Sequence, residues 1–286
     1  MSHAPQGDNR NASHRDPFMI RHLSLLGLGT GLLFSVVPAQ ADGVATPLWS
    51  FANVSANYLD WSSGSETRTA SNAAKSDFVY LELEGGAGYS WGEFYGFLDF
   101  ENPGNDRFDE DSGGKDNFRT AAKVTTHLYM GETPFSVYAH VYDFRDYGFE
   151  AREQDQILGL GYRHTFDNGL WFKPFLGAAR VQSDGFTGMN GFMAGWVAGY
   201  DFSVLDQAFS LTQWHEQTFD RDDDYLRQNY IGDKAGEVGT NGALSLWWHP
   251  HRRLTAGVQY RYADNKLGTP GQYQNAMIYT LKFNLL

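Results

Sequence analysis

Runs of about ten residues in which apolar and polar side chains alternate make up most of this chain, and that pattern limits what it can fold into. In the run 77–84, apolar side chains take one face and polar side chains take the other: Val79, Leu81 and Leu83 against Tyr80, Glu82 and Glu84. Alternation at every second residue is typical of a β-strand with one apolar face. Since no long helical period competes with it after the first forty residues, the sequence predicts an all-β fold.

Twelve strand-like runs follow one another: 48–61, 77–84, 93–101, 119–130, 135–143, 155–166, 170–182, 192–202, 208–219, 239–249, 254–263 and 275–286. The connections between them alternate in length. The short ones are 85–92, 131–134, 167–169, 203–207 and 250–253. The long ones are 62–76, 102–118, 144–154, 183–191, 220–238 and 264–274.

This alternation of connection lengths indicates the class of protein. Bacterial outer-membrane barrels have an even number of antiparallel strands, with short turns at one rim and long loops at the other. Soluble β-sandwiches mix their loop lengths freely. The sequence therefore predicts one domain, a twelve-stranded antiparallel transmembrane β-barrel.

The alternation alone does not say which face lies inside the barrel. In a transmembrane barrel the apolar face contacts lipid and the polar face lines the lumen. Aromatic residues near the strand ends favour this arrangement, because aromatic girdles mark the two membrane interfaces. The expected girdle residues are Trp49, Trp61, Trp91, Trp171, Trp247 and Tyr262.

The first 41 residues have the features of an export signal. Basic Arg21 and His22 precede an apolar stretch over 23–37, and Ala39-Gln40-Ala41 forms an A-x-A cleavage site. We expect 1–41 to be a signal peptide with an extended n-region and 42–286 to be the mature barrel. Such a chain would pass through the periplasm to the outer membrane of a Gram-negative cell.

Charge and motifs exclude several classes of function. The chain has 22 Lys and Arg against 34 Asp and Glu, so nucleic acid is not an expected partner. The acidic stretch 109–117 begins like a calcium loop, but Gly113 replaces a ligand and Thr120 stands where a bidentate Glu is needed. We expect no metal site and no cofactor. The acidic loops are expected to be solvated and bridged to lipopolysaccharide by divalent ions.

One stretch resembles a known family. Tyr80-Leu81-Glu82-x-Glu84, followed after six residues by Trp91-x-Glu93-Phe94-Tyr95-Gly96-Phe97-x-Asp99, is similar to the signature of the nucleoside-specific outer-membrane channels, the Tsx and OmpK family. The run Leu158-Gly159-Leu160-Gly161 is a weaker match. The resemblance implies a monomeric twelve-stranded barrel through which nucleosides diffuse.

The end of the chain departs from this family. Its members usually end on an aromatic residue that helps the outer-membrane assembly machinery recognise the last strand, whereas this chain ends Phe283-Asn284-Leu285-Leu286. The aromatic residue is displaced by three positions, so we expect a weakened recognition signal. The assembly machinery remains an expected partner.

The candidate binding residues are polar and aromatic side chains on predicted lumen faces. Carboxylates and cations can bond the hydroxyls of a ribose, and each ring stacked on a base is worth about 1–3 kcal/mol. The lumen residues expected to bind solute are Tyr80, Glu82, Glu84, Tyr95, Phe97, Asp99, Arg119, Lys123 and Tyr138. The same charges would equally serve as a network that holds the barrel wall together.

Other functions stay open at this point. A structural or receptor barrel, for example one used by a bacteriophage, would show the same strands with a filled lumen. An outer-membrane barrel enzyme needs a nucleophile motif, which does not accompany the candidate histidines His127, His140, His164, His215 and His249. We therefore expect a channel and not an enzyme. In 192–202 and 208–219 the pattern does not decide which alternating side chains face the lumen, and 213–217 is expected near or above the outer rim.

Overall fold

The structure is a computed structural model that describes residues 46–70, 74–229 and 235–286. The predicted signal peptide, 1–41, lies outside the described residues.

We propose that the chain is cleaved after Ala41, on the basis of the A-x-A motif in the sequence. N-terminal sequencing of the membrane-extracted protein should then begin at Asp42, and a mature chain beginning at Met1 or Met19 would contradict the proposal.

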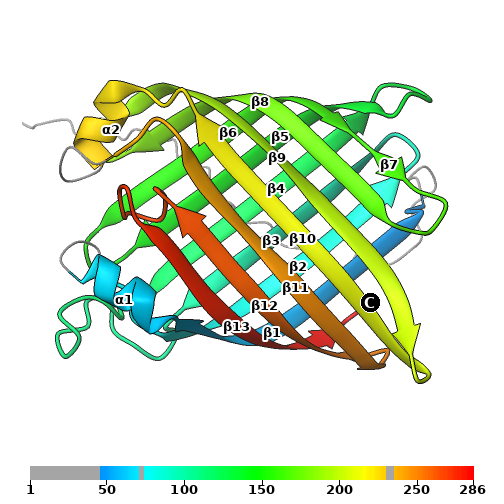
Figure 1. The fold of residues 1–286 in the computed structure, drawn as a ribbon, viewed down its shortest axis with the longest axis horizontal. Coiled ribbons are helices and arrows are strands. Elements are labelled where there is room, and N and C mark those ends of the chain that lie inside the picture. Colours follow the sequence, from blue (N-terminus) through cyan, green and yellow to red (C-terminus); the bar gives the residue numbers. More distant parts are fainter. Residues whose placement is uncertain (1–45, 71–73, 230–234) are drawn as a thin grey trace, which may run out of the picture. The chain divides into compact units, whose positions relative to one another are not determined.

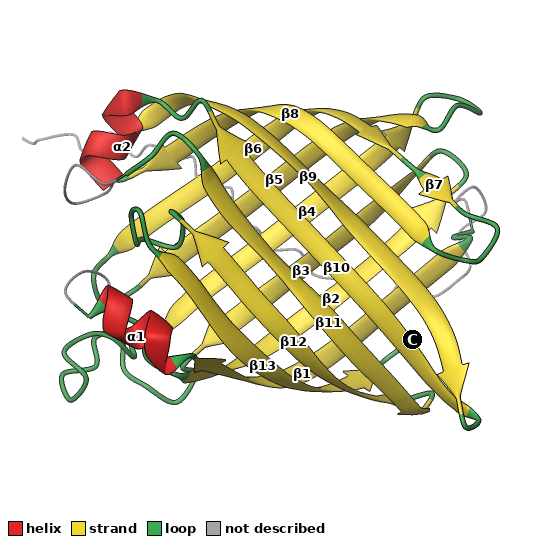
Figure 2. Ribbon diagram, in the orientation of Figure 1, coloured by secondary structure: helices red, strands yellow, loops and turns green. Residues whose placement is uncertain are grey.

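Strands dominate the described chain, with two seven-residue helices between them (Figure 2). In chain order the elements are β1 (Trp49–Trp61), α1 (Ser63–Thr69), β2 (Phe78–Tyr89), β3 (Gly92–Glu101), β4 (Arg119–Tyr129), β5 (Phe135–Asp146), β6 (Ala151–Tyr162), β7 (His164–Thr165), β8 (Trp171–Ser183), β9 (Thr187–Val204), β10 (Gln207–Phe219), α2 (Asp223–Asn229), β11 (Gly239–His251), β12 (Leu254–Asp264) and β13 (Tyr273–Asn284). Apart from the two-residue β7, these are the twelve strands predicted from the sequence.

The sheet closes on itself. Apart from β6 and β7, strands that are neighbours in the chain pair antiparallel. β6 pairs instead with β8, and β1 pairs with β13 from Asn53↔Asn284 to Trp61↔Ala276 (Figure 1). A closed barrel leaves no strand edge, so the backbone groups of the strands are bonded within the sheet. The predicted fold class, a twelve-stranded antiparallel barrel, is confirmed.

The two rims differ as expected, but several strands are longer than predicted. β2 continues to Tyr89, so its turn into β3 contains only Ser90 and Trp91. The predicted long loops 144–154 and 183–191 are also mostly strand, and only 147–150 and 184–186 lie outside. Both helices lie at the end where the long connections gather (Figure 2). At the other end, Leu205 and Asp206 turn β9 into β10 with φ of 49° and 60°, as a type I′ turn requires.

The exposures confirm which face points outward. On β2, Val79 and Leu81 are 54% and 44% exposed, whereas the intervening Tyr80 is 8% exposed. Because a closed barrel packs its inward side chains against each other, the exposed apolar set must be the outer, lipid-facing wall. In the described part of the chain, neither α1 nor α2 is long and apolar enough to cross a membrane.

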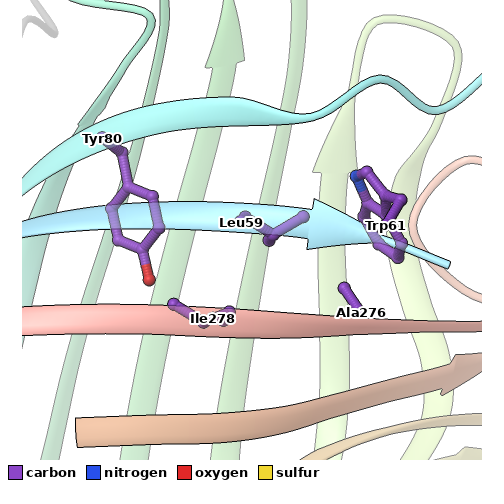
Figure 3. Packing of buried hydrophobic residues seen from close by; sticks show 5 residues of the cluster. All are labelled: Leu59, Trp61, Tyr80, Ala276 and Ile278. Carbon is purple, nitrogen blue, oxygen red and sulfur yellow. The ribbon is translucent and has the colours of Figure 1, made fainter.

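Two of the apolar clusters formed by the described residues fill parts of the lumen. One contains Leu59 and Trp61 of β1, Tyr80 of β2, and Ala276 and Ile278 of β13 (Figure 3). The other joins β5, β6, β8 and β9 through Tyr138, Ile157, Phe175, Ala179 and Met193. The lumen wall is therefore partly apolar, which the polar-inside rule did not predict.

The predicted aromatic girdle is partly wrong. Trp61 and Trp247 are buried inside the barrel, and Trp49 and Trp171 lie beside the Lys173 ammonium at the short-turn mouth. Trp91, at 47% exposed, keeps an interfacial place. A neighbouring position contributes to the outer ring in place of a predicted one: Trp248, next to Trp247, is 43% exposed.

The register of the sheet shows which side chains of β9 and β10 face the lumen. Trp214 pairs with Val197, and His215 pairs with Trp196. The Trp214 ring lies beside the ammonium of Lys123, so Trp214 and Val197 share the inner face. His215 and Trp196 therefore share the outer face, where their rings stack at 4.3 Å between centroids.

Candidate functional site

Glu84 is the centre of a polar belt in the lumen. Its carboxylate accepts hydrogen bonds from Asn53 Nδ2 at 3.1 Å, from the Tyr95 hydroxyl at 2.9 Å, and from the Lys282 ammonium. These partners come from β1, β3 and β13, all close to β2 in the ring of strands. Glu82, two residues before Glu84 on the same face of β2, extends the belt, and its carboxylate accepts a hydrogen bond from Ser55 Oγ at 3.4 Å.

Neutral polar side chains continue this belt around the wall. Asn57 Nδ2 donates to Ser55 Oγ at 2.9 Å, and Thr280 Oγ1 donates to Asn57 Oδ1 at 2.7 Å. Gln259 Nε2 donates to Thr280 at 3.2 Å and accepts at Oε1 from Ser245 at 3.1 Å. Sequence reasoning missed these residues, although Asn53, Ser55 and Asn57 alternate with apolar residues along β1.

An ion pair crosses the lumen between two distant strands. Lys123 of β4 donates to Glu216 of β10, two strands on nearly opposite sides of the ring. His140 Nδ1 lies 3.9 Å from the same carboxylate. The Trp214 ring lies between two cations, with Lys123 Nζ 5.2 Å and Arg261 Cζ 4.6 Å from its centroid.

This pair corrects the prediction for 213–217. Those residues were expected near or above the outer rim, because they are polar on both faces. Instead Glu216 bonds Lys123 in the middle of β4, and the outward-facing polar groups bond each other: His215 Nδ1 lies 2.9 Å from the Tyr262 hydroxyl, and Gln213 accepts from Trp196 Nε1.

The short-turn mouth carries a second transverse ion pair. Lys173 Nζ lies 2.6 Å from Glu93 Oε1, and the Tyr129 hydroxyl donates to Glu93 at 2.9 Å. The guanidinium of Arg163 lies over the Tyr129 ring at 3.6 Å. Together with Trp49 they border a hollow of about 370 Å³.

Loops tie the opposite mouth together. Lys266, between β12 and β13, reaches Asp155 of β6 at 3.7 Å, and the Tyr225 hydroxyl of α2 donates to Glu153 at 2.9 Å. Lys75 Nζ donates to the Leu267 carbonyl at 2.7 Å, and burial lowers the pKa of Lys75 to about 8. These contacts narrow the mouth at the long-loop rim.

The predicted binding residues fall into two groups. Glu82 pairs across strands with Asp99, and Glu84 pairs with Phe97, so with Tyr95 these five residues form one patch of β2 and β3. The other four lie elsewhere and are otherwise engaged. Lys123 is in the transverse ion pair, Arg119 Nε lies 2.6 Å from Glu101, Tyr80 packs in an apolar cluster, and the Tyr138 ring stacks on Phe175 at 4.1 Å.

Several buried lumen atoms have no hydrogen-bond partner among the described residues. They include Asp99 Oδ1, His140 Nε2, Asn241 Oδ1 and Arg261 Nη1. A buried polar group without a partner costs free energy, and a polar solute in the lumen can supply the missing bond once a neighbouring side chain moves and uncovers the atom. The set contains acceptors and donors, which suits hydroxyl groups better than an ion of one sign.

The described residues also bear on two other kinds of site, a metal centre and a catalytic triad. No group of three His, Asp or Glu side chains fit to hold a metal occurs within 46–70, 74–229 and 235–286. Ser210 lies between Asp201 and His249, donating to Asp201 at 2.6 Å, with His249 Nε2 at 2.8 Å. In a catalytic triad the histidine stands between serine and carboxylate and takes the serine proton. Here that proton is already directed to Asp201.

Comparison with known proteins bears on the whole barrel. The family model described as "Nucleoside-specific channel-forming protein, Tsx" matches residues 56–285. Similar solved structures include the outer membrane channel DcaP of Acinetobacter baumannii, at 10% identity over 86% of this chain and 99% of that chain, with a TM-score of 0.40. OprD from Pseudomonas aeruginosa is 10% identical over 82% and 93% of the two chains, with a TM-score of 0.31. At these scores neither structure informs the chemistry of this lumen.

Proposed function

Because the chain belongs to the family of nucleoside-specific channel-forming Tsx proteins, we propose that its lumen passes nucleosides or similarly small, neutral solutes. The protein is a channel of the Gram-negative outer membrane, and the proposal concerns what that channel admits. The proposal rests on the patch of acidic and aromatic side chains that β2 and β3 present to the lumen.

The patch combines two kinds of group that a nucleoside needs. Glu82 and Asp99 lie opposite each other on adjacent strands, and the buried, unpartnered Oδ1 of Asp99 can accept a ribose hydroxyl once a neighbouring side chain moves aside. Tyr95 and Phe97 lie on the same face as Asp99, with ring centroids 6.5 Å apart and ring planes at 65°. One of these rings is proposed to stack on the base. Weak, repeated contacts of this kind let a solute leave as well as enter.

Charge supports a neutral solute. Carboxylates in the lumen are paired with cations, as Glu84 is with Lys282 and Glu216 with Lys123. The chain as a whole is acidic, with 34 Asp and Glu against 22 Lys and Arg. A negative field at the mouth repels phosphorylated nucleotides, which carry charge of the same sign.

Uptake into liposomes tests this proposal. Vesicles carrying the purified protein should take up labelled nucleosides faster than nucleotides and faster than sugars of similar size. Entry of all three at rates set by size alone would indicate a general pore. Entry of none would indicate a structural or receptor barrel, and either result would overturn the proposal.

Substitutions in the patch test the assigned residues. Tyr95→Ala or Asp99→Asn should each weaken nucleoside affinity about tenfold, the factor that corresponds to ~1.4 kcal/mol. Competition of unlabelled nucleoside against labelled uptake measures this affinity. Phe94→Ala is the matched control, because Phe94 lies beside Tyr95 but is 38% exposed on the outer wall. If selective uptake survives both lumen substitutions, the assignment of Tyr95 and Asp99 as binding residues is wrong, while the proposed nucleoside channel still stands.

A further inference from the structure

The outer wall of the barrel carries a polar network where lipid-facing strands are expected to be apolar. Register places Asp143 of β5 opposite Gln154 of β6, and Gln156 of β6 opposite Arg180 of β8. Arg145 lies opposite Arg152 on the same two strands, β5 and β6. These six residues, here named the arginine network, therefore share one outward face.

Hydrogen bonds join the network into a single chain across three strands. Asp143 accepts from Arg145 Nε at 2.8 Å, from Arg152 Nη2 at 3.1 Å and from Gln154 Nε2 at 2.9 Å. Gln154 Oε1 accepts from Gln156 Nε2 at 2.7 Å. Gln156 Oε1 in turn accepts from Arg180 Nη1 at 3.3 Å. The side chains are held in position before any ligand binds.

The network has more positive than negative charge. It holds three guanidinium groups but one carboxylate, that of Asp143, which bonds Arg145 and Arg152; the side chains of these two arginines are 40% and 39% exposed. Asp184, at the rim, accepts the backbone N–H of Arg152 at 2.9 Å. The other cations in described strands bond or stack inside the barrel: Arg119, Lys123, Lys173, Arg261 and Lys282.

Its position corresponds to the level of lipid headgroups. On each strand the network lies closer to the long-loop rim than the exposed apolar residues Val141, Leu158 and Leu176. In outer-membrane barrels the long loops face the outside of the cell, so this edge of the apolar band meets the outer leaflet. Anionic headgroups lie immediately above that edge.

We propose that the arginine network binds the phosphorylated sugar headgroup of lipopolysaccharide. Guanidinium groups bind phosphate through two parallel hydrogen bonds, and this geometry suits arginine better than lysine. Asp143 orients two of the guanidinium groups and neutralises about one of three charges, which leaves an excess that an anionic headgroup can balance. Lipopolysaccharide is thereby held directly by cations, in contrast to the predicted divalent bridges from acidic loops.

A binding measurement on protein refolded in detergent, free of bacterial lipid, tests this proposal. Fluorescent lipopolysaccharide is titrated into the wild type, the triple variant Arg145→Gln/Arg152→Gln/Arg180→Gln, and the control Arg252→Gln/Arg253→Gln. The control removes two exposed arginines from the short turn at the opposite rim. We expect the triple variant to lose at least tenfold in affinity and the control to match the wild type.

The ligand is varied as well. Enzymatically dephosphorylated lipopolysaccharide should bind the wild type about tenfold more weakly, and millimolar inorganic phosphate should compete only weakly. Equal binding by the triple variant, an equal loss in the control, indifference to dephosphorylation or full competition by phosphate would each overturn the proposal.

Folding is checked by the different gel mobility of boiled and unboiled samples. If the triple variant does not fold, Arg180→Gln alone replaces it, since that change leaves the three bonds of Asp143 intact. It should weaken lipopolysaccharide binding about threefold, and unchanged binding would overturn the proposal.

Discussion

Replacing Glu216 with glutamine should destabilise the barrel by about 3–5 kcal/mol, the usual cost of removing one partner of a buried ion pair. The side chains of Lys123 and Glu216 are only 12% and 13% exposed. Without the carboxylate, the ammonium of Lys123 remains in the lumen close to Trp214, whose ring also faces Arg261. Two cations then repel each other with no anion between them.

Urea unfolding of the protein in detergent micelles or lipid vesicles measures this loss. The double variant Lys123→Met/Glu216→Gln is the control, because it removes both charges and should be less destabilised than Glu216→Gln alone. Equal stability of the wild type and the single variant would show that the pair is solvated and contributes little.

The single-channel conductance of the double variant should be higher than that of the wild type, since the ion pair crosses the lumen between β4 and β10.

Arginine in place of Leu81 should cost up to about 2–4 kcal/mol, because a cation on the lipid-facing wall must leave water. Leu81 is 44% exposed on β2, and its neighbours across the sheet are Ala56 and Phe100. The same urea titration, carried out in lipid vesicles, measures the loss.

The control for this variant is Thr187→Arg. Thr187 is exposed at the start of β9, on the outer face at the long-loop rim, where arginine should cost about 0–1 kcal/mol. Inward positions are poor controls: Thr280 is 6% exposed and hydrogen bonded to Asn57 and Gln259. Equal costs for Leu81→Arg and Thr187→Arg would show that the outer wall is wrongly assigned.

The strand count and the outward face were predictable because both follow from local periodicity. Val79, Leu81 and Leu83 repeat at every second residue, and any closed sheet must place such a set on one side. The strand ends were harder to predict, since β5 and β6 extend through 144–146 and 151–154, which are mostly polar, and β9 begins already at Thr187. Period-two patterns cannot distinguish such an extension from a loop.

The contents of the lumen were predictable only along one hairpin. Glu82, Tyr95 and Asp99 come from adjacent strands, so register within β2 and β3 is enough to bring them together. Glu216 comes from the far wall, and its pairing with Lys123 depends on the diameter and stagger of the whole barrel. Tyr138 was expected to face solute, but its ring stacks on Phe175, two strands away in the ring.

The seam between β1 and β13 has a consequence for folding. It joins the two ends of the barrel sequence, with Asn53 opposite Asn284 and the backbone N–H of Leu285 donating to the Ala52 carbonyl at 2.8 Å. Contacts between residues so far apart in sequence carry a large loop-closure entropy, which slows their formation. Until the seam forms, two strand edges with unpaired backbone groups remain open to pairing with other chains. The chain therefore needs protection from aggregation until its first and last strands meet.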